Sequence, residues 1–145
     1  MEVEIINKEL RLHLYGFAGF VSDKDYVSTI FKLTDKMWQV VKAESLKNFG
    51  KNIWVYEYDE KVFAGVELQE IPKQESGLEL KTIKLNNYGY YKHIGAYTEL
   101  KEAGEKMKSA LKNKGYTVTF PYIEIYGHWT ADETKLETEL FMNLI

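Results

Sequence analysis

Two stretches of the chain follow the same order of hydrophobic periodicities. In each stretch, apolar and polar residues first alternate as in a β-strand. Apolar residues then recur at helical spacing, and two further segments alternate again as strands. The first stretch covers residues 1–71 and the second covers residues 78–145, and a polar segment at residues 72–77 separates them. This order predicts a single α+β domain, 1–145, built from a duplicated strand-helix-strand-strand module.

The predicted elements can be bounded by their periodicity and by their flanking residues. In the first half we expect an extended segment at 1–20 that bends near Asn7, a helix capped by Ser22, Asp23 or Asp25 that stops near Asn48–Gly50, and strands at 52–58 and 62–68. In the second half we expect an extended segment at 78–91, a helix capped by Thr98 that ends at 113–115, a strand through 121–127 and a strand at 136–144. We expect one antiparallel sheet with both helices on one face, and a cleft on the other face where the halves meet.

Residues Pro121–Gly127 alternate strictly between two kinds of side chain. Two isoleucines point to one side of this strand, and Tyr122, Glu124 and Tyr126 point to the other. A carboxylate between two phenol rings is typical of a solvated sheet surface, or of a cleft that holds a cationic or polarisable ligand. The alternation alone leaves both interpretations open.

Other strands are predicted to add aromatic and acidic side chains to the face of Glu124. Ile53 and Val55 suit the helix side of the sheet, so the alternate residues of their strand belong to the open side. No lysine or arginine on these strands is assigned to that side. The assigned residues are Trp54, Tyr56, Tyr58, Phe63, Glu67, Tyr122, Glu124, Tyr126, Glu137, Glu139 and Phe141.

An acidic group among aromatic rings has a definite chemical preference. A carboxylate away from water is costly unless it is hydrogen-bonded or paired, and tyrosine hydroxyls can donate those bonds while the site is empty. A cationic ligand then supplies the opposite charge, and each well-placed ring adds about 0.5–2 kcal/mol of cation–π attraction. The 11 tyrosines also exceed what a core requires. The predicted ligand-binding residues are Glu124, Glu139, Trp54, Tyr56, Tyr91, Tyr122, Tyr126 and Phe141.

Composition excludes several other classes of protein. The net charge of −3 comes from interspersed charges, which argues against a nucleic-acid surface. The absence of cysteine and the scattered positions of the three histidines argue against a metal centre. We therefore expect no cofactor, no metal, no direct nucleic-acid contact and no membrane contact. Without a signal peptide or a long apolar run, we expect a soluble cytoplasmic protein.

Four short segments together carry a resemblance to a known family. They are Tyr91-x-His93-x-Gly95-x-Tyr97-x-x-Leu100, Gly115-Tyr116, Pro121–Gly127 and Thr138-Glu139-Leu140. These segments resemble the gyrase-inhibitor-like domain, which is also the effector-binding domain of AraC-type and multidrug-sensing transcription regulators. The resemblance implies that aromatic residues and a buried glutamate bind lipophilic cations. Glu124 matches the glutamate of the family's Glu-x-Tyr strand, and Glu139 matches the acidic position of its last strand.

These observations lead to one functional hypothesis and two alternatives. The chain is too short to add a helix-turn-helix domain, so it resembles the free-standing members, and we expect a stand-alone binding module for amphipathic or cationic small molecules. The first alternative is a hydrolase of strained electrophilic toxins, in which Glu124 acts as general acid or base and Tyr126 assists. The second is a protein that binds gyrase or a separate regulatory partner, and a homodimer also stays open.

Overall fold

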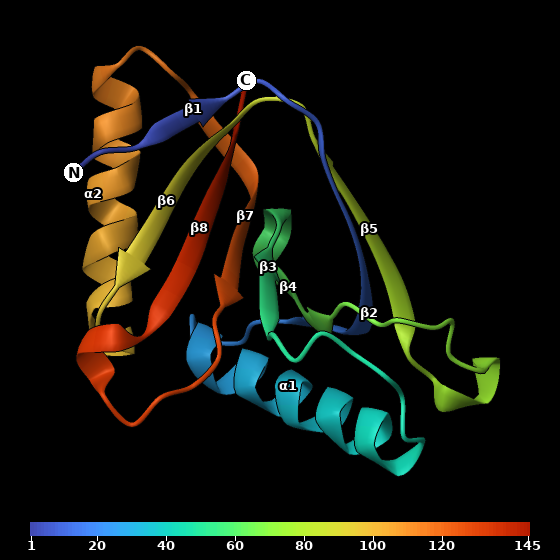
Figure 1. The fold of residues 1–145 in the computed structure, drawn as a ribbon. Helices are drawn as coiled ribbons and strands as arrows, with labels where there is room; N and C mark the ends of the chain where they lie inside the picture. The colour runs from blue at the N-terminus through green and yellow to red at the C-terminus, as the bar shows by residue number, and fades with distance from the viewer.

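The computed structural model describes all residues, Met1–Ile145, as an eight-stranded antiparallel sheet with two helices, which confirms the predicted α+β class (Figure 1). The strands are β1 (Glu4–Ile6), β2 (Leu10–Phe20), β3 (Ile53–Tyr56), β4 (Lys61–Val66), β5 (Glu79–Leu85), β6 (Tyr88–Ile94), β7 (Val118–Tyr126) and β8 (Glu137–Leu144). The helices are α1 (Tyr26–Ala43) and α2 (Leu100–Asn113). Neither helix is long and apolar enough to cross a membrane.

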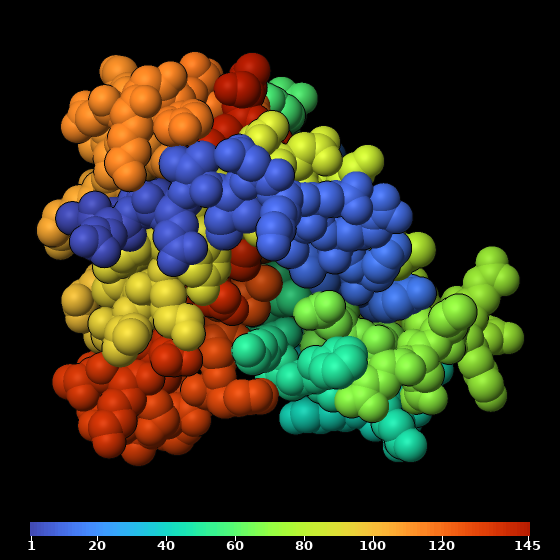
Figure 2. All heavy atoms as spheres, turned by 45° about the horizontal axis from the view of Figure 1, so that its top comes forward, coloured from blue at the N-terminus to red at the C-terminus, as the bar shows by residue number.

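The strand order is symmetric about the centre of the sheet. It runs β1-β6-β8-β7-β3-β4-β2-β5, so β7 and β3 meet in the middle, one from each half of the chain. Each half also gives its first strand to the other, because β1 pairs with β6 and β5 pairs with β2. Figure 2 shows the blue N-terminal residues lying against the yellow residues of β6. The segments predicted as single extended pieces, 1–20 and 78–91, are therefore two strands each, with partners in different halves.

The helix ends agree only in part with the sequence prediction. The Asp25 side chain caps α1 by accepting the Ser28 N–H at 3.1 Å. This helix ends at Ala43, before the predicted Asn48–Gly50, because Ser45 adopts a left-handed φ of 52°. The prediction that Thr98 caps α2 is wrong: Thr98 lies in a separate 3₁₀ turn, and no side chain caps α2.

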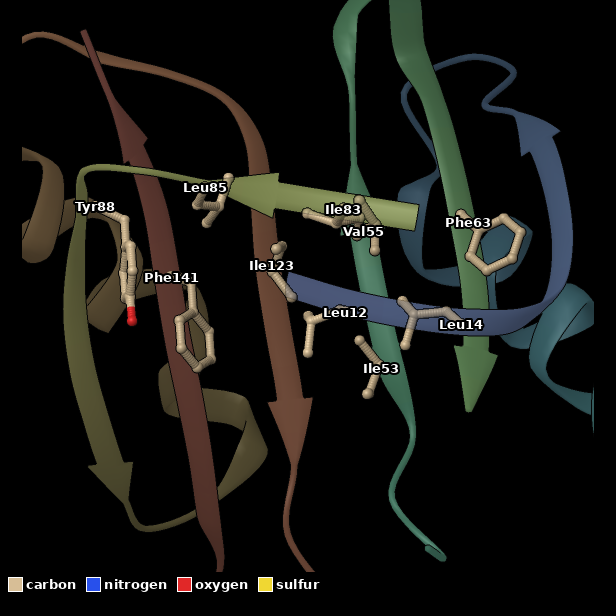
Figure 3. Packing of buried hydrophobic residues seen from close by; sticks show 10 residues of the cluster. All are labelled: Leu12, Leu14, Ile53, Val55, Phe63, Ile83, Leu85, Tyr88, Ile123 and Phe141. Carbon is tan, nitrogen blue, oxygen red and sulfur yellow. The ribbon is translucent and has the colours of Figure 1, made fainter. Parts of the chain in front are cut away.

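The largest hydrophobic cluster lies on the face of the sheet away from the helices. In Figure 3, strands β2 and β5 cross over β3 and β7, so the sheet folds back on itself and buries aliphatic side chains between its own strands. The cluster contains Leu12, Leu14, Ile53, Val55, Phe63, Ile83, Leu85, Tyr88, Ile123 and Phe141. The prediction that Ile53 and Val55 lie under the helices is therefore wrong. Alternation separates two sets of side chains, but it does not say which set the helices cover.

The two helices pack on the other face through separate clusters. Helix α1 buries Ile30, Met37 and Val41 against β2, β3 and β4, whereas α2 buries Met107 and Leu111 against β6 and β8. Strands β3 and β7 lie between these clusters, and they present Trp54, Tyr56, Tyr122, Glu124 and Tyr126 there. The cleft at the seam of the halves is thus on the helix face, with the helices as its walls, and not on the open face.

Candidate functional site

Glu124 lies at the centre of the seam, on the floor of the cleft. It is paired across the two central strands with Trp54, and it is 7% exposed. Its Oε1 accepts hydrogen bonds from the hydroxyls of Tyr56 (3.0 Å) and Tyr126 (2.9 Å), and its Oε2 accepts one from Tyr122 (2.9 Å). Tyr122 and Tyr126 flank Glu124 on its own strand because side chains two residues apart share a face. Three phenols therefore hold this buried carboxyl group in one orientation.

Burial and hydrogen bonding shift the pKa of the Glu124 carboxyl group in opposite directions. Burial raises the pKa of Glu124, and the hydrogen bonds from Tyr122, Tyr126 and Tyr56 lower it by a smaller amount. Burial and the neighbouring carboxylate raise the pKa of all three phenols. The phenols consequently remain protonated donors, and ionisation of the buried carboxyl group is less favourable than it is in water.

No basic side chain neutralises Glu124. The seven ion pairs of the structure all involve other carboxylates. A buried carboxylate whose only partners are neutral hydroxyls lacks the charge compensation that stabilises its ionised form. The site is therefore electrostatically suited to receive a positive group.

Aromatic rings surround this carboxyl group on both sides of the seam. Trp54 lies with its ring centre 4.7 Å from that of Tyr126, and Tyr56 lies 5.4 Å from Tyr122. The Trp54 ring is fixed from behind, because its Nε1–H donates to Thr34 Oγ1 at 3.0 Å. Such rings present electron-rich faces, and cations are attracted to them.

The space above these rings is a cavity between α1 and α2. Its volume is about 1270 Å³, above the roughly 300–1,000 Å³ that is common for ligand pockets. The first turn and a half of α1 forms one wall through Tyr26, Val27 and Phe31. Helix α2 forms the opposite wall, and the loop after β7 contributes Trp129, which is exposed at the mouth.

Gly104 brings the backbone of α2 close to the floor of the cavity. A Cβ atom added to Gly104 would lie 3.7 Å from the Tyr122 hydroxyl, which is an ordinary van der Waals contact. Glycine inside a helix costs about 0.5–1 kcal/mol relative to alanine. We therefore expect Gly104→Ala to raise the free energy of unfolding by about 0.5–1 kcal/mol, as measured by urea denaturation.

Gly16 provides the matched control for that substitution. A Cβ atom there would lie 1.9 Å from the carbonyl oxygen of Ala64, in the paired strand β4. Gly16→Ala should destabilise the protein, because neither backbone can move without breaking the ladder between them. A loss of stability in Gly104→Ala would contradict the space that the structure shows between α2 and Tyr122.

Five of the eight residues predicted from the sequence meet in the cavity. Their side chains line its floor and come from the two central strands. They are Trp54, Tyr56, Tyr122, Glu124 and Tyr126.

The structure separates the other three from the cavity. The pairing of β7 with β8 places Phe141 opposite Ile123 and Glu139 opposite Ile125, so both lie on the aliphatic side of the sheet. Phe141 is part of the large cluster, and Glu139 accepts a hydrogen bond from Tyr90 at 2.6 Å. Tyr91 is on the helix face but packs against the α2 cluster outside the cavity. The prediction that Glu139 and Phe141 share the face of Glu124 is wrong, and so is that for Phe63, which is in the large cluster.

Sequence reasoning missed part of the aromatic wall. Tyr26 lies 6.1 Å from Tyr56, Phe31 lies 5.3 Å from Trp54, and Tyr97 packs edge-on to Tyr126 at 5.4 Å. The helical spacing of the first two predicts a core stripe and gives no sign of a cavity. The surplus of tyrosine was the only signal that further rings belonged to the site.

His93, from the motif Tyr91-x-His93-x-Gly95, lies on β6 outside the site. It is buried next to Thr138 in the paired strand β8, and its Nε2 has no partner within the protein. Its ring does not line the cavity.

The fold and the cavity define a class of protein: an α+β fold with a large aromatic cavity between its two halves. The family described as the GyrI-like small molecule binding domain matches residues 1–145. The chain belongs to this family, which confirms the resemblance seen in its motifs. No curated protein matches the chain in sequence.

Solved structures share this fold over the whole chain. The C-terminal domain of EcmrR has a TM-score of 0.77 and 19% identity, and the match covers 100% of this chain and 99% of that one. SAV2435 bound to tetraphenylphosphonium has a TM-score of 0.66 and 19% identity, with coverages of 100% and 94%. A hydrolase from Listeria innocua has a TM-score of 0.63 and 11% identity, with coverages of 99% and 92%. At identities this low, the similarity establishes the fold alone.

Proposed function

We propose that the protein is a receptor for amphipathic organic cations of drug-like size. The observation that supports this most is Glu124, a buried carboxyl group held by three phenols, without a basic partner, on the floor of a large aromatic cavity. A cation placed there supplies the missing charge, and its apolar part replaces water against the rings.

The aromatic residues suit ligands that are bulky and flat or propeller-shaped. The rings of Trp54, Tyr56 and Tyr126 are tilted relative to their neighbours, at 57° for Trp54 and Tyr126 and at 44° for Tyr26 and Tyr56. Tilted rings present faces and edges in several directions, so cations of different shape can each find a contact. This geometry supports broad recognition of a chemical class. The tetraphenylphosphonium bound to SAV2435 is an organic cation of that class.

The proposal is tested by titrating tetraphenylphosphonium into the protein and following tryptophan emission. Trp54 and Trp129 line the cavity and should report the bound cation, whereas Trp38 is not part of the cavity lining. Saturable quenching that is lost in Glu124→Gln supports the proposal. Quenching of equal strength and affinity in Glu124→Gln, or no saturation at all, overturns it.

The affinity for tetraphenylphosphonium is expected to rise with pH. Burial raises the pKa of Glu124, and a cation favours the ionised carboxylate over the neutral acid. Below that pKa, the affinity should increase by up to about tenfold per pH unit, and it should level off above it. Because this cation does not titrate, dissociation constants measured from about pH 5 to about pH 9 report on the protein.

Glu124→Gln is the control for this pH dependence, since its amide does not ionise. Its affinity should be nearly constant over the same range. A wild-type affinity that falls as the pH rises would show that Glu124 is not the group that receives the charge.

Hydrolysis of a strained electrophile is the second candidate function. It is favoured by the raised pKa of Glu124 and by the Tyr126 hydroxyl at 2.9 Å, since a carboxyl group with a raised pKa can exchange a proton with a substrate. Time-dependent conversion of such a compound, abolished in Glu124→Gln, would establish turnover. Recovery of unchanged ligand after saturable binding would favour the receptor.

A further inference from the structure

The wall of the cavity formed by α2 has a row of lysines. Lys101, Lys108 and Lys112 all line the cavity and are exposed. At about 100° per residue, they fall within a sector of roughly 40° on the helix, beside the face that packs on the sheet. The row extends over about 16 Å along the helix axis. The structure turns this sector of α2 toward the cavity.

The positive charge of this row is largely uncompensated. None of the three lysines takes part in an ion pair. Glu105 is the one acidic residue of α2 that lines the cavity. Across the cavity, Glu57 is paired with Lys81 and Lys61, so its charge is already satisfied. The α2 wall thus has a net positive charge, while the floor has the carboxyl group of Glu124.

Gly104 lies on the cavity lining between these two charged regions. It lies on α2 between Lys101 and Lys108, next to the Tyr122 hydroxyl that donates to Glu124. Helix α2 lies close to the floor at this point, and Lys101 and Lys108, before and after Gly104 on the helix, line the same cavity as Glu124. A molecule whose positive end meets Glu124 therefore has its other end within reach of lysine ammonium groups.

We propose that the preferred ligands are zwitterions: amphipathic aromatic molecules with a cationic group for Glu124 and a carboxylate or similar anionic group for Lys101, Lys108 and Lys112. The proposal rests on the cation site at Glu124 and deepens it. A purely cationic ligand gains the floor contact but meets repulsion from the lysines at the wall. A zwitterion gains both contacts, since opposite charges attract at each end.

Two dyes with the same ring system provide the test. Rhodamine 6G is a cation whose carboxyl group is blocked as an ethyl ester, and rhodamine 19 is its free acid, a zwitterion at neutral pH. At low ionic strength, we expect the wild type to bind rhodamine 19 several-fold more tightly than rhodamine 6G. The triple variant Lys101→Gln/Lys108→Gln/Lys112→Gln should bind rhodamine 19 about tenfold more weakly, since three exposed charge contacts together contribute about that factor. Its affinity for rhodamine 6G should stay equal or increase.

A second triple variant controls for net charge. Lys32→Gln/Lys42→Gln/Lys106→Gln removes the same number of charges from helix positions outside the cavity lining, and should leave both affinities within about twofold. Added salt should reduce the preference of the wild type for rhodamine 19, because exposed charges are screened.

The outcomes separate this inference from the proposed function. If both dyes bind through Glu124 with equal affinity and neither responds to the lysine substitutions, the inference is overturned and the cation receptor stands. If neither dye binds, both the inference about zwitterions and the proposed cation receptor are overturned. Fluorescein, an anion with a related ring system, should bind worst, and binding as tight as that of rhodamine 19 would mean a site for anions and would also overturn the inference.

Discussion

Glu124→Gln is expected to weaken tetraphenylphosphonium binding by about 100-fold, which corresponds to about 2.7 kcal/mol. Glutamine has the size of glutamate, and its amide can still exchange hydrogen bonds with the hydroxyls of Tyr56, Tyr122 and Tyr126. The substitution therefore removes charge while preserving the shape of the floor. A charge contact in a buried site is worth more than one at the surface, since water does not screen it. Titration calorimetry gives the two dissociation constants directly.

Glu139→Gln is the matched control for this substitution. Glu139 is also a carboxylate bonded to a tyrosine, at 2.6 Å from the Tyr90 hydroxyl, but it lies on the opposite side of the sheet. Its substitution should leave the dissociation constant within about twofold, since contacts that do not touch the ligand rarely change it more. If Glu139→Gln weakens binding as much as Glu124→Gln, the assignment of the two carboxylates to different faces is incorrect.

Phe63→Ala is expected to lower the free energy of unfolding by about 3–5 kcal/mol. Phe63 is 2% exposed and belongs to the ten-residue cluster where the sheet folds over itself. Truncation removes the apolar contacts of the ring and leaves a cavity that the surrounding strands cannot fill. Urea denaturation followed by far-ultraviolet circular dichroism measures the change.

Phe31→Ala is the comparison for this substitution, because it removes a phenyl ring from the wall of the cavity and not from the core. Phe31 is 52% exposed and packs edge-on against Trp54 at 5.3 Å. We expect it to cost less than about 1 kcal/mol of stability, because the ring is half in solvent, and to weaken tetraphenylphosphonium binding several-fold. The reverse result, with Phe63→Ala harmless and Phe31→Ala strongly destabilising, would contradict the division of the sheet into a core face and a cavity face.

Relationships within one strand were predictable from the sequence. Alternation alone places Tyr122 and Tyr126 beside Glu124, and it places Trp54 with Tyr56, because successive side chains on a strand point to opposite sides. The order of strands and helices was also readable, since strand and helix periods differ. The exchange of β1 and β5 between the halves was not readable, because it depends on which distant strand each one pairs with.

Relationships between strands were where the prediction of the site went wrong. Glu139 was grouped with Glu124 because the alternate residues Leu140, Met142 and Leu144 suited the core, but the register of β7 and β8 pairs Glu124 with Leu140. That register depends on the loop of residues 127–136 and on the irregularity between Thr119 and Tyr122. Neither the loop nor the irregularity has a periodic sequence pattern, so the register between β7 and β8 cannot be predicted from the sequence.

The amino-acid pattern was sufficient to define two sets of side chains, one aliphatic and one acidic and aromatic, because the period of a strand is a local property. It did not say which set becomes core and which lines a cavity. That assignment came from contacts between residues far apart in the chain: β2 and β5 fold over Ile53 and Ile123 and bury them, while α1 and α2 pack apart and leave space above Glu124. The hydrophobic effect has no preferred direction, and apolar side chains can be buried on either side of the sheet. Only the assembled fold therefore determines on which side the site forms.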